Sequence, residues 1–257
     1  MVLSLVKLGG SVITEKNRPL TMAVSNCKRL ARELSSYLNG GENNLILVHG
    51  GGSFGHMKAK KYDLSPGRGR IIDYLEVRND MRALNHRLIS LFLDNGIRCL
   101  STPADSLWHF RDATAVSGDL TVLSTLLNLK VVPITFGDVV CDDLHGFSIV
   151  SGDSLMLYLS KHFRPDITIF CTDVDGVYDK NPKTSADARM LQYVDTSTLV
   201  SADSNRNDVT GGMSFKLRSM LSIAEHSGKT VVLNGRKEGR LASALAGAAT
   251  TCTIVRP

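Results

Sequence analysis

Short apolar runs, rich in β-branched residues, recur along the chain with segments of helical length between most of them. They occupy residues 2–6, 45–48, 97–100, 131–135, 167–172, 230–233 and 251–255. Strands that alternate with helices predict a mostly parallel sheet covered by helices on both faces. We therefore expect an α/β fold, a three-layer αβα sandwich around a central, mostly parallel sheet. In such folds ligands bind at the carboxyl ends of the strands.

Two further segments have a clear periodicity. After Tyr74, apolar residues recur at alternating spacings of four and three, which predicts an amphipathic helix that ends at Asn95 and Gly96. Residues 139–150 predict instead a β-hairpin that turns near residues 143–146. The apolar positions of the predicted helix are Val77, Met81, Leu84, Leu88 and Leu91.

The composition fits a single folded domain over residues 1–257, with 43% hydrophobic and 21% charged residues and no linker-like run. The net charge of +5 suits acidic ligands, but basic and acidic residues are interspersed, so small phosphates are a better expectation than nucleic acid. No apolar run approaches the roughly 20 residues that span a bilayer, so we expect no membrane association. The five cysteines form no C-x-x-C pair, which predicts buried, reduced thiols in the cytoplasm.

The strand-like run at residues 45–48 leads into the sequence HGGGSFGH, residues 49–56, which contains four glycines in six positions. Such a segment lets several main-chain N–H groups turn toward one point, an arrangement that suits a phosphate. His56 follows directly, and an imidazole can donate a charge-assisted hydrogen bond to an anion near neutral pH. The segment is therefore a candidate site for a phosphate monoester.

Gly50, Gly52 and Gly55 also match the G-x-G-x-x-G fingerprint of dinucleotide-binding proteins. That fingerprint requires a second strand that ends in an acidic residue about 20 residues later. Residues 67–73 are instead a glycine- and arginine-rich loop that runs into a helix. A nicotinamide cofactor is therefore a poor interpretation of these glycines. No G-x-x-x-x-G-K-[ST] P-loop occurs in the chain either.

The first predicted strand ends in Lys7, and Gly9, Gly10 and Ser11 follow it. A lysine beside a glycine turn and a hydroxyl can surround transferring phosphates with one cation and several N–H groups. Lys16 is close enough in sequence to swing over the same site. The alternative is that Lys7 is a solvated lysine before a plain turn. The presence of the glycine segment at residues 49–56 makes that alternative less attractive.

Three clusters later in the chain carry candidate polar residues. Residues 151–153, Ser-Gly-Asp, predict a helix start with an acidic cap, and Asp153 could also hold two lysines in position. The run TDVDGVYD at residues 172–179 suggests a metal site, but its spacing fails the EF-hand pattern, and a nucleoside-binding turn fits equally well. Lys216 follows a glycine turn near the start of a helix, where it could reach a nucleotide phosphate or be a surface lysine.

In their order and wording, these clusters resemble the amino-acid kinase family over nearly the whole chain, and the form HGGGSFGH is similar to the archaeal-type isopentenyl phosphate kinases within it. The resemblance implies the amino-acid kinase fold, with an acceptor-binding lobe at about residues 1–150 and a nucleotide-binding lobe at about 151–257. It also implies that a homodimer uses ATP and Mg²⁺ to phosphorylate isopentenyl phosphate to isopentenyl diphosphate for isoprene biosynthesis in the mevalonate pathway.

The resemblance further implies how the reaction is catalysed. Lys7 and Lys216 would neutralise the nucleotide phosphates. Lys16 would stabilise the transferring group, and Asp153 would orient the lysines. A phosphate acceptor is already ionised, and phosphoryl transfer depends on positioning and charge neutralisation more than on a base. The lack of an obvious general base is therefore compatible with this chemistry.

The two substrate sites follow from the same resemblance. The acceptor phosphate would bind His56 and the amides of Gly51 and Gly52, and Gly152 would approach it from a facing helix. The run MSF at residues 213–215 departs from the smaller or more basic run expected there, which puts in doubt an auxiliary phosphate contact. The implied nucleotide-binding positions, besides the two lysines, are Gly9, Gly10, Ser11, Gly52, Asp173, Asp175, Gly176, Tyr178, Lys183 and Gly212.

Two other functions stay open at this stage. A fosfomycin kinase resembles the family in its glycine segment followed by histidine and also phosphorylates a phosphorus oxyacid. A nucleotide-binding storage or regulatory protein on the same fold would bind ATP without turnover, although such a protein has no need of all four matched cationic positions. An isoprenoid tail requires an apolar slot, which is the feature that separates the first two functions. Its candidate walls are Phe54, Met81, Leu84, Ile149 and Leu155.

Overall fold

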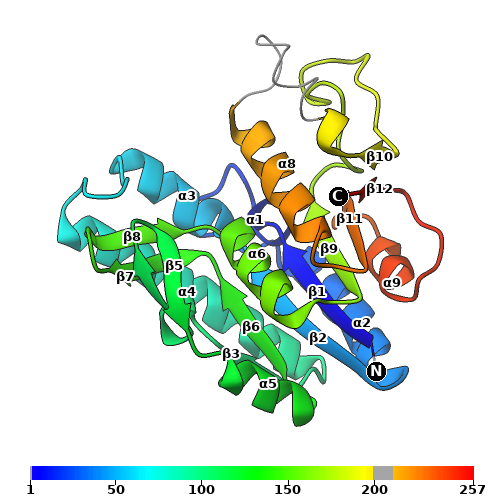
Figure 1. Cartoon of the computed structure of the whole chain (residues 1–257), viewed down its shortest axis with the longest axis horizontal. Helices are drawn as coiled ribbons and strands as arrows, with labels where there is room; N and C mark the ends of the chain where they lie inside the picture. Colours follow the sequence, from blue (N-terminus) through cyan, green and yellow to red (C-terminus); the bar gives the residue numbers. More distant parts are fainter. Residues whose placement is uncertain (1, 199–210) are drawn as a thin grey trace.

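Figure 1 shows the computed structural model of the chain, which describes residues 2–198 and 211–257, with the backbone alone at residues 211–215. Within these residues the main sheet has eight strands in the order β10-β12-β11-β9-β1-β2-β6-β3. All neighbouring pairs are parallel except β11 and β12. The strands are β1 (Val2–Leu8), β2 (Asn43–His49), β3 (Cys99–Ser101), β6 (Val132–Phe136), β9 (Ile167–Thr172), β10 (Tyr193–Val194), β11 (Lys229–Asn234) and β12 (Cys252–Val255).

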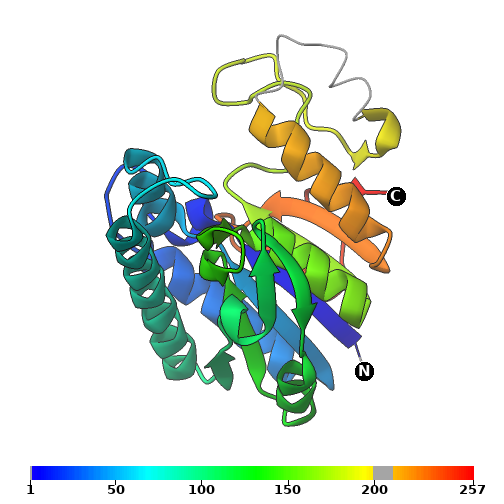
Figure 2. The ribbon, with the colours of Figure 1, turned by 60° about the vertical axis from the view of Figure 1, so that its left-hand side comes forward.

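Helices cover both faces of this sheet, which confirms the predicted α/β sandwich (Figure 2). On one face α2, α4 and α9 pack against the strands, and on the other face α5, α6 and α8 do so. The short helices α1 and α3 lie at one end of the sheet. The helices are α1 (Gly10–Ile13), α2 (Val24–Asn39), α3 (Gly52–Lys61), α4 (Ile71–Asp94), α5 (Thr121–Asn128), α6 (Gly152–Phe163), α8 (Gly211–Ala224) and α9 (Arg240–Leu245), with a 3-10 turn at Ala104–Ser106.

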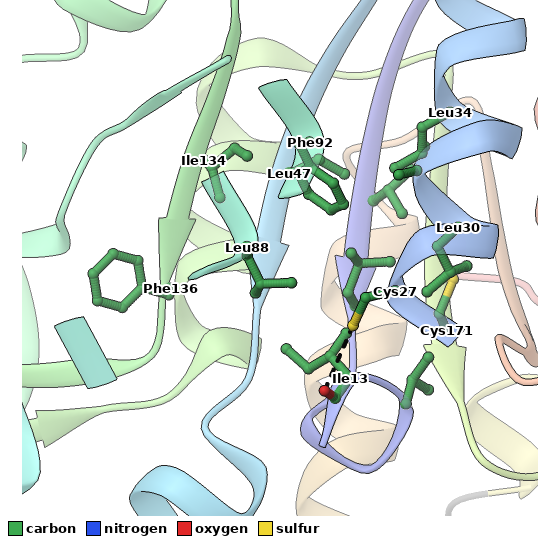
Figure 3. Packing of buried hydrophobic residues seen from close by; sticks show 14 of the residues in the cluster. Ile13, Cys27, Leu30, Leu34, Leu47, Leu88, Phe92, Ile134, Phe136 and Cys171 are labelled. Atoms are coloured by element: carbon green, nitrogen blue, oxygen red, sulfur yellow. Dashed lines mark hydrogen bonds between the residues drawn. The ribbon is translucent and has the colours of Figure 1, made fainter. Parts of the chain in front are cut away.

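The strands divide the apolar core into two clusters because successive side chains point to opposite faces. Val6 belongs to the cluster beneath α2 and α4, whereas its neighbour Leu5 belongs to the cluster beneath α6 and α8. Figure 3 shows the first cluster, where side chains of α2 and α4 meet the sheet and the Cys27 thiol donates to the Ile13 carbonyl over 3.6 Å. Burying one such leucine side chain stabilises the fold by about 1.5–3 kcal/mol. The rigid sheet that results fixes the positions of the strand ends.

The long helix α4 begins at Ile71, earlier than the sequence pattern predicts. Ile71 and Ile72 are 66% and 53% exposed, so the first turn lacks the apolar period on which the prediction was based. Tyr74 lies on the buried side, and its hydroxyl donates to the carbonyls of Ser65 and Arg68 over 2.7 and 2.6 Å. These bonds hold the loop before α4 against the helix.

A second sheet of four strands, in the order β5-β4-β7-β8, lies beside the first. Its strands are β4 (Trp108–Arg111), β5 (Thr114–Gly118), β7 (Asp138–Asp142) and β8 (Gly146–Val150). The antiparallel pair β7 and β8 confirms the predicted hairpin. The Asp142 carboxylate stabilises its turn by accepting from the amides of Leu144 and His145 over 3.0 and 3.1 Å.

Two compositional expectations have different outcomes. Cys27, Cys99 and Cys171 are buried free thiols, but Cys141 is exposed and Cys252 is half-buried, so the expectation that the thiols are buried is wrong for these two. Cys141 lies on the exposed side of β7, whereas Cys252 packs against the edge of the first core cluster. Among residues 2–198 and 211–257, no helix has both the length and the hydrophobicity needed to cross a membrane.

Candidate functional site

A cavity of about 520 Å³ lies where β1, β2 and β9 end. Its lining includes Lys7 and Gly9 from the end of β1, residues 50–52 after β2, and residues 171–173 at the end of β9. Lys216 of α8 and Gly152 of α6 complete the opposite side. A smaller cavity of about 170 Å³ lies near the amino ends of β2 and β6, and its lining holds none of the predicted site residues. The candidate site is therefore at the carboxyl ends of the parallel strands, as predicted for this fold class.

The two glycine segments pack directly against each other. A methyl group on Gly10 would lie 2.2 Å from the Gly52 nitrogen, so only glycine allows this approach. Gly52 has a φ of +50°, and the Thr14 hydroxyl links the segments by accepting from the Ser53 amide (3.0 Å) and donating to the Gly10 carbonyl (2.7 Å). Both segments open helices rather than plain loops, because α1 begins at Gly10 and α3 at Gly52. His56 is thus a residue of the helix α3.

Helix amino termini converge on the cavity. No side chain caps α3, and within the described residues neither the Gly51 nor the Gly52 amide donates to a protein group. The helix α6 also begins at the cavity, at Gly152. Unpaired amides and the positive ends of helix dipoles favour anions. The amides of Gly51 and Gly52 therefore have the geometry and polarity that suit an anion.

Lys7 and Asp153 form an ion pair in the floor of the cavity, with Nζ and Oδ1 2.6 Å apart and both side chains at most 14% exposed. Burial lowers the pKa of Lys7, an effect that the Asp153 carboxylate opposes and the charge of Lys216 reinforces. Ser151, not Asp153, caps α6, because its hydroxyl accepts from the Ser154 amide. The predicted acidic cap is wrong, and Asp153 is left to orient Lys7.

His56 faces the cavity from α3. The surrounding protein lowers the pKa of His56, and the charges of Lys216 and Lys7 lower it further. Burial and the two nearby cations therefore both disfavour the protonated imidazole, whereas Asp153 favours it. A phosphate bound here would raise the pKa of His56 again, because its negative charge offsets the lysine charges and its oxygens accept a hydrogen bond from the imidazole.

Asp173 holds a cluster at the other side of the cavity. Its Oδ2 contacts Lys16 Nζ over 2.7 Å and also the ammonium group of Lys183, and its Oδ1 accepts from the Ser11 hydroxyl over 3.0 Å. Although burial raises the pKa of Asp173, hydrogen bonds from Lys16, Lys183 and Ser11 hold it well below its usual range. Asp173 is therefore an ionised carboxylate that binds two lysines.

Most of the other residues in the predicted nucleoside-binding turn, residues 172–179, contact other parts of the protein. Asp175 accepts from Asn234 (2.9 Å), the last residue of β11, and from Arg240 (2.7 Å), the first residue of α9. Sequence reasoning missed both because they lie about 60 residues further along the chain. Gly176 lines the cavity, and a methyl group there would lie 2.3 Å from the Thr253 hydroxyl oxygen. Asp175, Tyr178 and Lys183 are not among the residues that line the cavity. The surroundings of Gly212, the side chains of residues 211–215 and the turn at residues 207–210 lie outside the described part.

The cavity continues into an apolar wall between α4 and β8. Val77, Met81 and Ile149 line it, which agrees with the prediction for Met81 and Ile149. Phe54, Leu84 and Leu155 do not line the cavity and are at most 1% exposed, so their predicted place in the wall is wrong. Met81 Sδ lies close enough to Gly51 and Gly55 that a methyl group on either glycine would come within 2.9 Å of it. The apolar wall thus touches the proposed phosphate site directly.

A buried carboxyl group, Asp138, also borders this part of the cavity and was not predicted. Its side chain is 1% exposed, with Oδ2 2.9 Å from Arg82 Nε, and Oδ1 accepts from the Val139 amide over 2.8 Å. Burial raises the pKa of Asp138 to about 7, even though Arg82 and Arg78 oppose this effect. The residue's only sequence signal is its place directly before the predicted hairpin of residues 139–150, which does not reveal burial.

The part of the chain that the structure describes contains no cluster of side chains suited to bind a metal ion. No group of three His, Cys, Asp or Glu side chains there could hold a metal ion. Asp153 and Asp173, which face the cavity, are bound to lysines instead. A Mg²⁺ ion would therefore depend on phosphate oxygens of a bound nucleotide for most of its ligands.

Comparisons with known proteins agree with this geometry. The model of the Amino acid kinase family matches residues 3–234. The chain is 37% identical to the isopentenyl phosphate kinase of Thermoplasma acidophilum over 90% of this chain and 89% of the relative. It is 33% identical to that of Methanocaldococcus jannaschii over 96% of each chain. A solved structure of an isopentenyl phosphate kinase superposes with a TM-score of 0.85 at 30% identity, over 98% of this chain and 99% of the other.

Proposed function

This chain belongs to the amino acid kinase family, and from that premise we propose that it transfers the γ-phosphoryl group of ATP to isopentenyl phosphate, forming isopentenyl diphosphate. The observation that carries the proposal is one cavity with two chemically different ends. At one end Lys7, Lys16, His56 and Lys216 surround it together with unpaired amides. At the other end the wall is apolar.

The acceptor would lie with its phosphate at the amino terminus of α3. His56 and the amides of Gly51 and Gly52 would hold the phosphate oxygens, and the five-carbon tail would lie along Met81 and Ile149. This arrangement matches the molecule, because a phosphate ester of a branched alkene needs one anion site joined to one apolar slot. Each buried methylene of the tail contributes about 0.8 kcal/mol to binding.

The nucleotide would approach from the side of α8 and β9. Lys7, fixed by Asp153, and Lys216 would offset the charge of its phosphates, while Lys16 would stabilise the phosphoryl group during transfer. These groups act by position and charge, which is the main requirement of a loose phosphoryl-transfer transition state. The acceptor oxygen is already ionised, so no side chain needs to remove a proton. The roles of the individual residues are part of the proposal.

Several finer expectations belong to the same proposal. The division into an acceptor lobe at about residues 1–150 and a nucleotide lobe at about 151–257 fits the positions of α3 and α8 on opposite sides of the cavity. A requirement for Mg²⁺, a homodimer, a cytoplasmic location and a place in the mevalonate pathway are also proposed. Each of these has its own direct test, in metal titration, mass determination, fractionation and complementation.

A coupled ADP-release assay tests the function with isopentenyl phosphate, dimethylallyl phosphate, fosfomycin, acetylglutamate and UMP as acceptors. We expect isopentenyl phosphate to give the highest kcat/KM. Turnover of fosfomycin alone would favour the phosphonate kinase. ATP binding without turnover of any acceptor would favour a storage or regulatory protein, and either result would contradict the proposal.

A further inference from the structure

The Asp173 cluster presents two cations on a single oxygen atom. Lys16 and Lys183 both contact Oδ2, while Ser11 occupies Oδ1. The Asp173 side chain is 19% exposed, whereas the lysine side chains are 53% and 47% exposed. The carboxylate is therefore the fixed partner, and the two lysines extend to it from opposite directions along the chain. One carboxylate charge cannot fully neutralise two ammonium groups at this distance.

The two lysines differ in their place relative to the cavity, because Lys16 lines it and Lys183 does not. The Lys183 amide donates to the Asn181 side chain over 3.0 Å, and the Thr184 amide donates to the Asn181 carbonyl over 3.1 Å, which fixes a turn around Lys183. That turn follows β9 closely in sequence, and β9 ends beside Asp173. Lys16 lies beyond α1, in the stretch between α1 and α2. Lys183 is thus placed to stay on Asp173 while Lys16 can leave it.

The ammonium groups of Lys16 and Lys183 also repel each other on the carboxylate that they share. Burial lowers the pKa of Lys16, Asp173 opposes this effect, and the neighbouring Lys183 lowers it further. For Lys183, burial is the largest effect and acts against the charged form, but the hydrogen bond and the ion pair with Asp173 oppose it, and the pKa is raised. Because the repulsion between the two ammonium groups is mutual, the departure of either lysine strengthens the interaction of Asp173 with the lysine that stays.

We propose that Lys183 is a positioning residue that releases Lys16 for catalysis: it shares Asp173 Oδ2 in the free protein and keeps that carboxylate neutralised once Lys16 moves to the transferring phosphoryl group. The inference rests on the proposed kinase function. Without Lys183, Lys16 would be the sole cation on a partly buried carboxylate, and its departure would leave that charge unpaired, which is costly. Lys183 would then act on the rate of transfer rather than on nucleotide affinity.

The proposal differs from a direct nucleotide contact in its kinetic signature. A lysine that binds ATP in the ground state raises the ATP KM and dissociation constant when it is removed. A lysine that only frees Lys16 lowers kcat and leaves ATP binding nearly unchanged. It also has no effect when Lys16 itself is absent.

The test uses Lys183→Met, Lys183→Arg, Lys16→Met and the double variant, with Lys180→Met as a matched control. Lys180 lies in the same segment but pairs with the exposed Asp187. We expect Lys183→Met to lower kcat about tenfold with less than about a threefold change in ATP KM and in the ATP dissociation constant from calorimetry. The arginine variant should recover most of the rate, because it still binds the carboxylate. The double variant should be no slower than Lys16→Met alone.

Three results would overturn the proposal: a large rise in ATP KM with unchanged kcat, additive losses in the double variant, or a Lys183→Met variant that behaves like Lys180→Met. Thermal unfolding checks that each variant is folded. If Lys183→Met is not folded, Lys183→Gln replaces it. If the unmodified protein releases no ADP with isopentenyl phosphate, the proposed function itself fails. If it turns over normally and the lysine variants disagree as above, only the role of Lys183 fails.

Discussion

Replacing Gly10 with alanine should separate the two glycine segments that build the phosphate site. The new methyl carbon would lie 2.2 Å from the Gly52 nitrogen and 2.5 Å from its Cα, whereas ordinary contacts begin near 3.4 Å. Because both obstacles are backbone atoms, no side chain can rotate away, and the segments must move apart by 3.4 − 2.2, about 1.2 Å. A misplacement of about 1 Å between reacting groups costs roughly a hundredfold in rate, or about 2.7 kcal/mol.

The assay measures kcat and both KM values for ADP release with isopentenyl phosphate, together with thermal unfolding. Gly41→Ala is the control, because a methyl group there meets only the end of the Asn43 side chain at 3.7 Å. Gly152→Ala is an intermediate case, since its nearest neighbour is the flexible Lys7 Cε at 3.2 Å. We expect losses in the order Gly10, Gly152, Gly41. A folded Gly10→Ala variant with activity within about threefold of the control would refute the idea that close backbone approach sets the reaction geometry.

Three further predictions follow from the same cavity. His56→Ala should reduce acceptor affinity far more than ATP affinity, measured by separate titrations, and His56→Gln should keep part of the activity because a neutral donor remains. Met81→Ala should raise the kcat/KM ratio of geranyl phosphate to isopentenyl phosphate, whereas Leu84→Ala should mainly lower stability, by about 2–5 kcal/mol. Burial raises the pKa of Asp138 from 3.8 to about 7, so this residue contributes stability that is present below pH 4 and lost as pH rises through 7. Asp138→Asn should flatten this decline in the free energy of unfolding, measured by chemical denaturation, by at most about 4 kcal/mol.

The main sheet could be predicted from the sequence because its strands are buried on both faces. Continuous apolar runs such as residues 45–48 and 167–172 have that character, and the structure confirms them to within a few residues. The strands β4 and β5 were missed because they are short and half exposed, with burial that alternates along β4. Their pairing depends on β7 and on each other, which a local pattern does not reveal.

The candidate site was predictable where glycine or lysine follows a strand directly. Lys7 and the HGGGSFGH segment occupy such positions, because parallel strands bring their carboxyl ends to one edge. The partners of these residues were less predictable. Asp173 was expected near the nucleoside but binds Lys16 and Lys183, and no spacing in the sequence distinguishes these two uses of a carboxylate. The contact of Asp173 with Lys16 joins segments 157 residues apart, which no local pattern reveals.

The two histidines of HGGGSFGH demonstrate why environment, and not residue type, decides the chemistry of the site. His49 is 1% exposed and stacks on Phe136 with ring centroids 4.9 Å apart, and burial lowers its pKa to about 4. Its Nδ1 donates to the Gly50 carbonyl over 3.2 Å, and its Nε2 accepts from Asn85 over 3.2 Å, so both nitrogens are used within the protein.

His56 has no such constraint and faces the cavity. Burial lowers its pKa, and the charges of Lys216 and Lys7 lower it further. An anion between these groups would remove the repulsion and favour the protonated ring, whereas no ligand can reach His49 in its stacked position. The first histidine therefore fixes the start of the glycine segment, and the second is free to respond to the phosphate that we propose the segment binds. A sequence match that counts both as equal site residues would assign catalytic importance to a side chain whose contribution is to the fold.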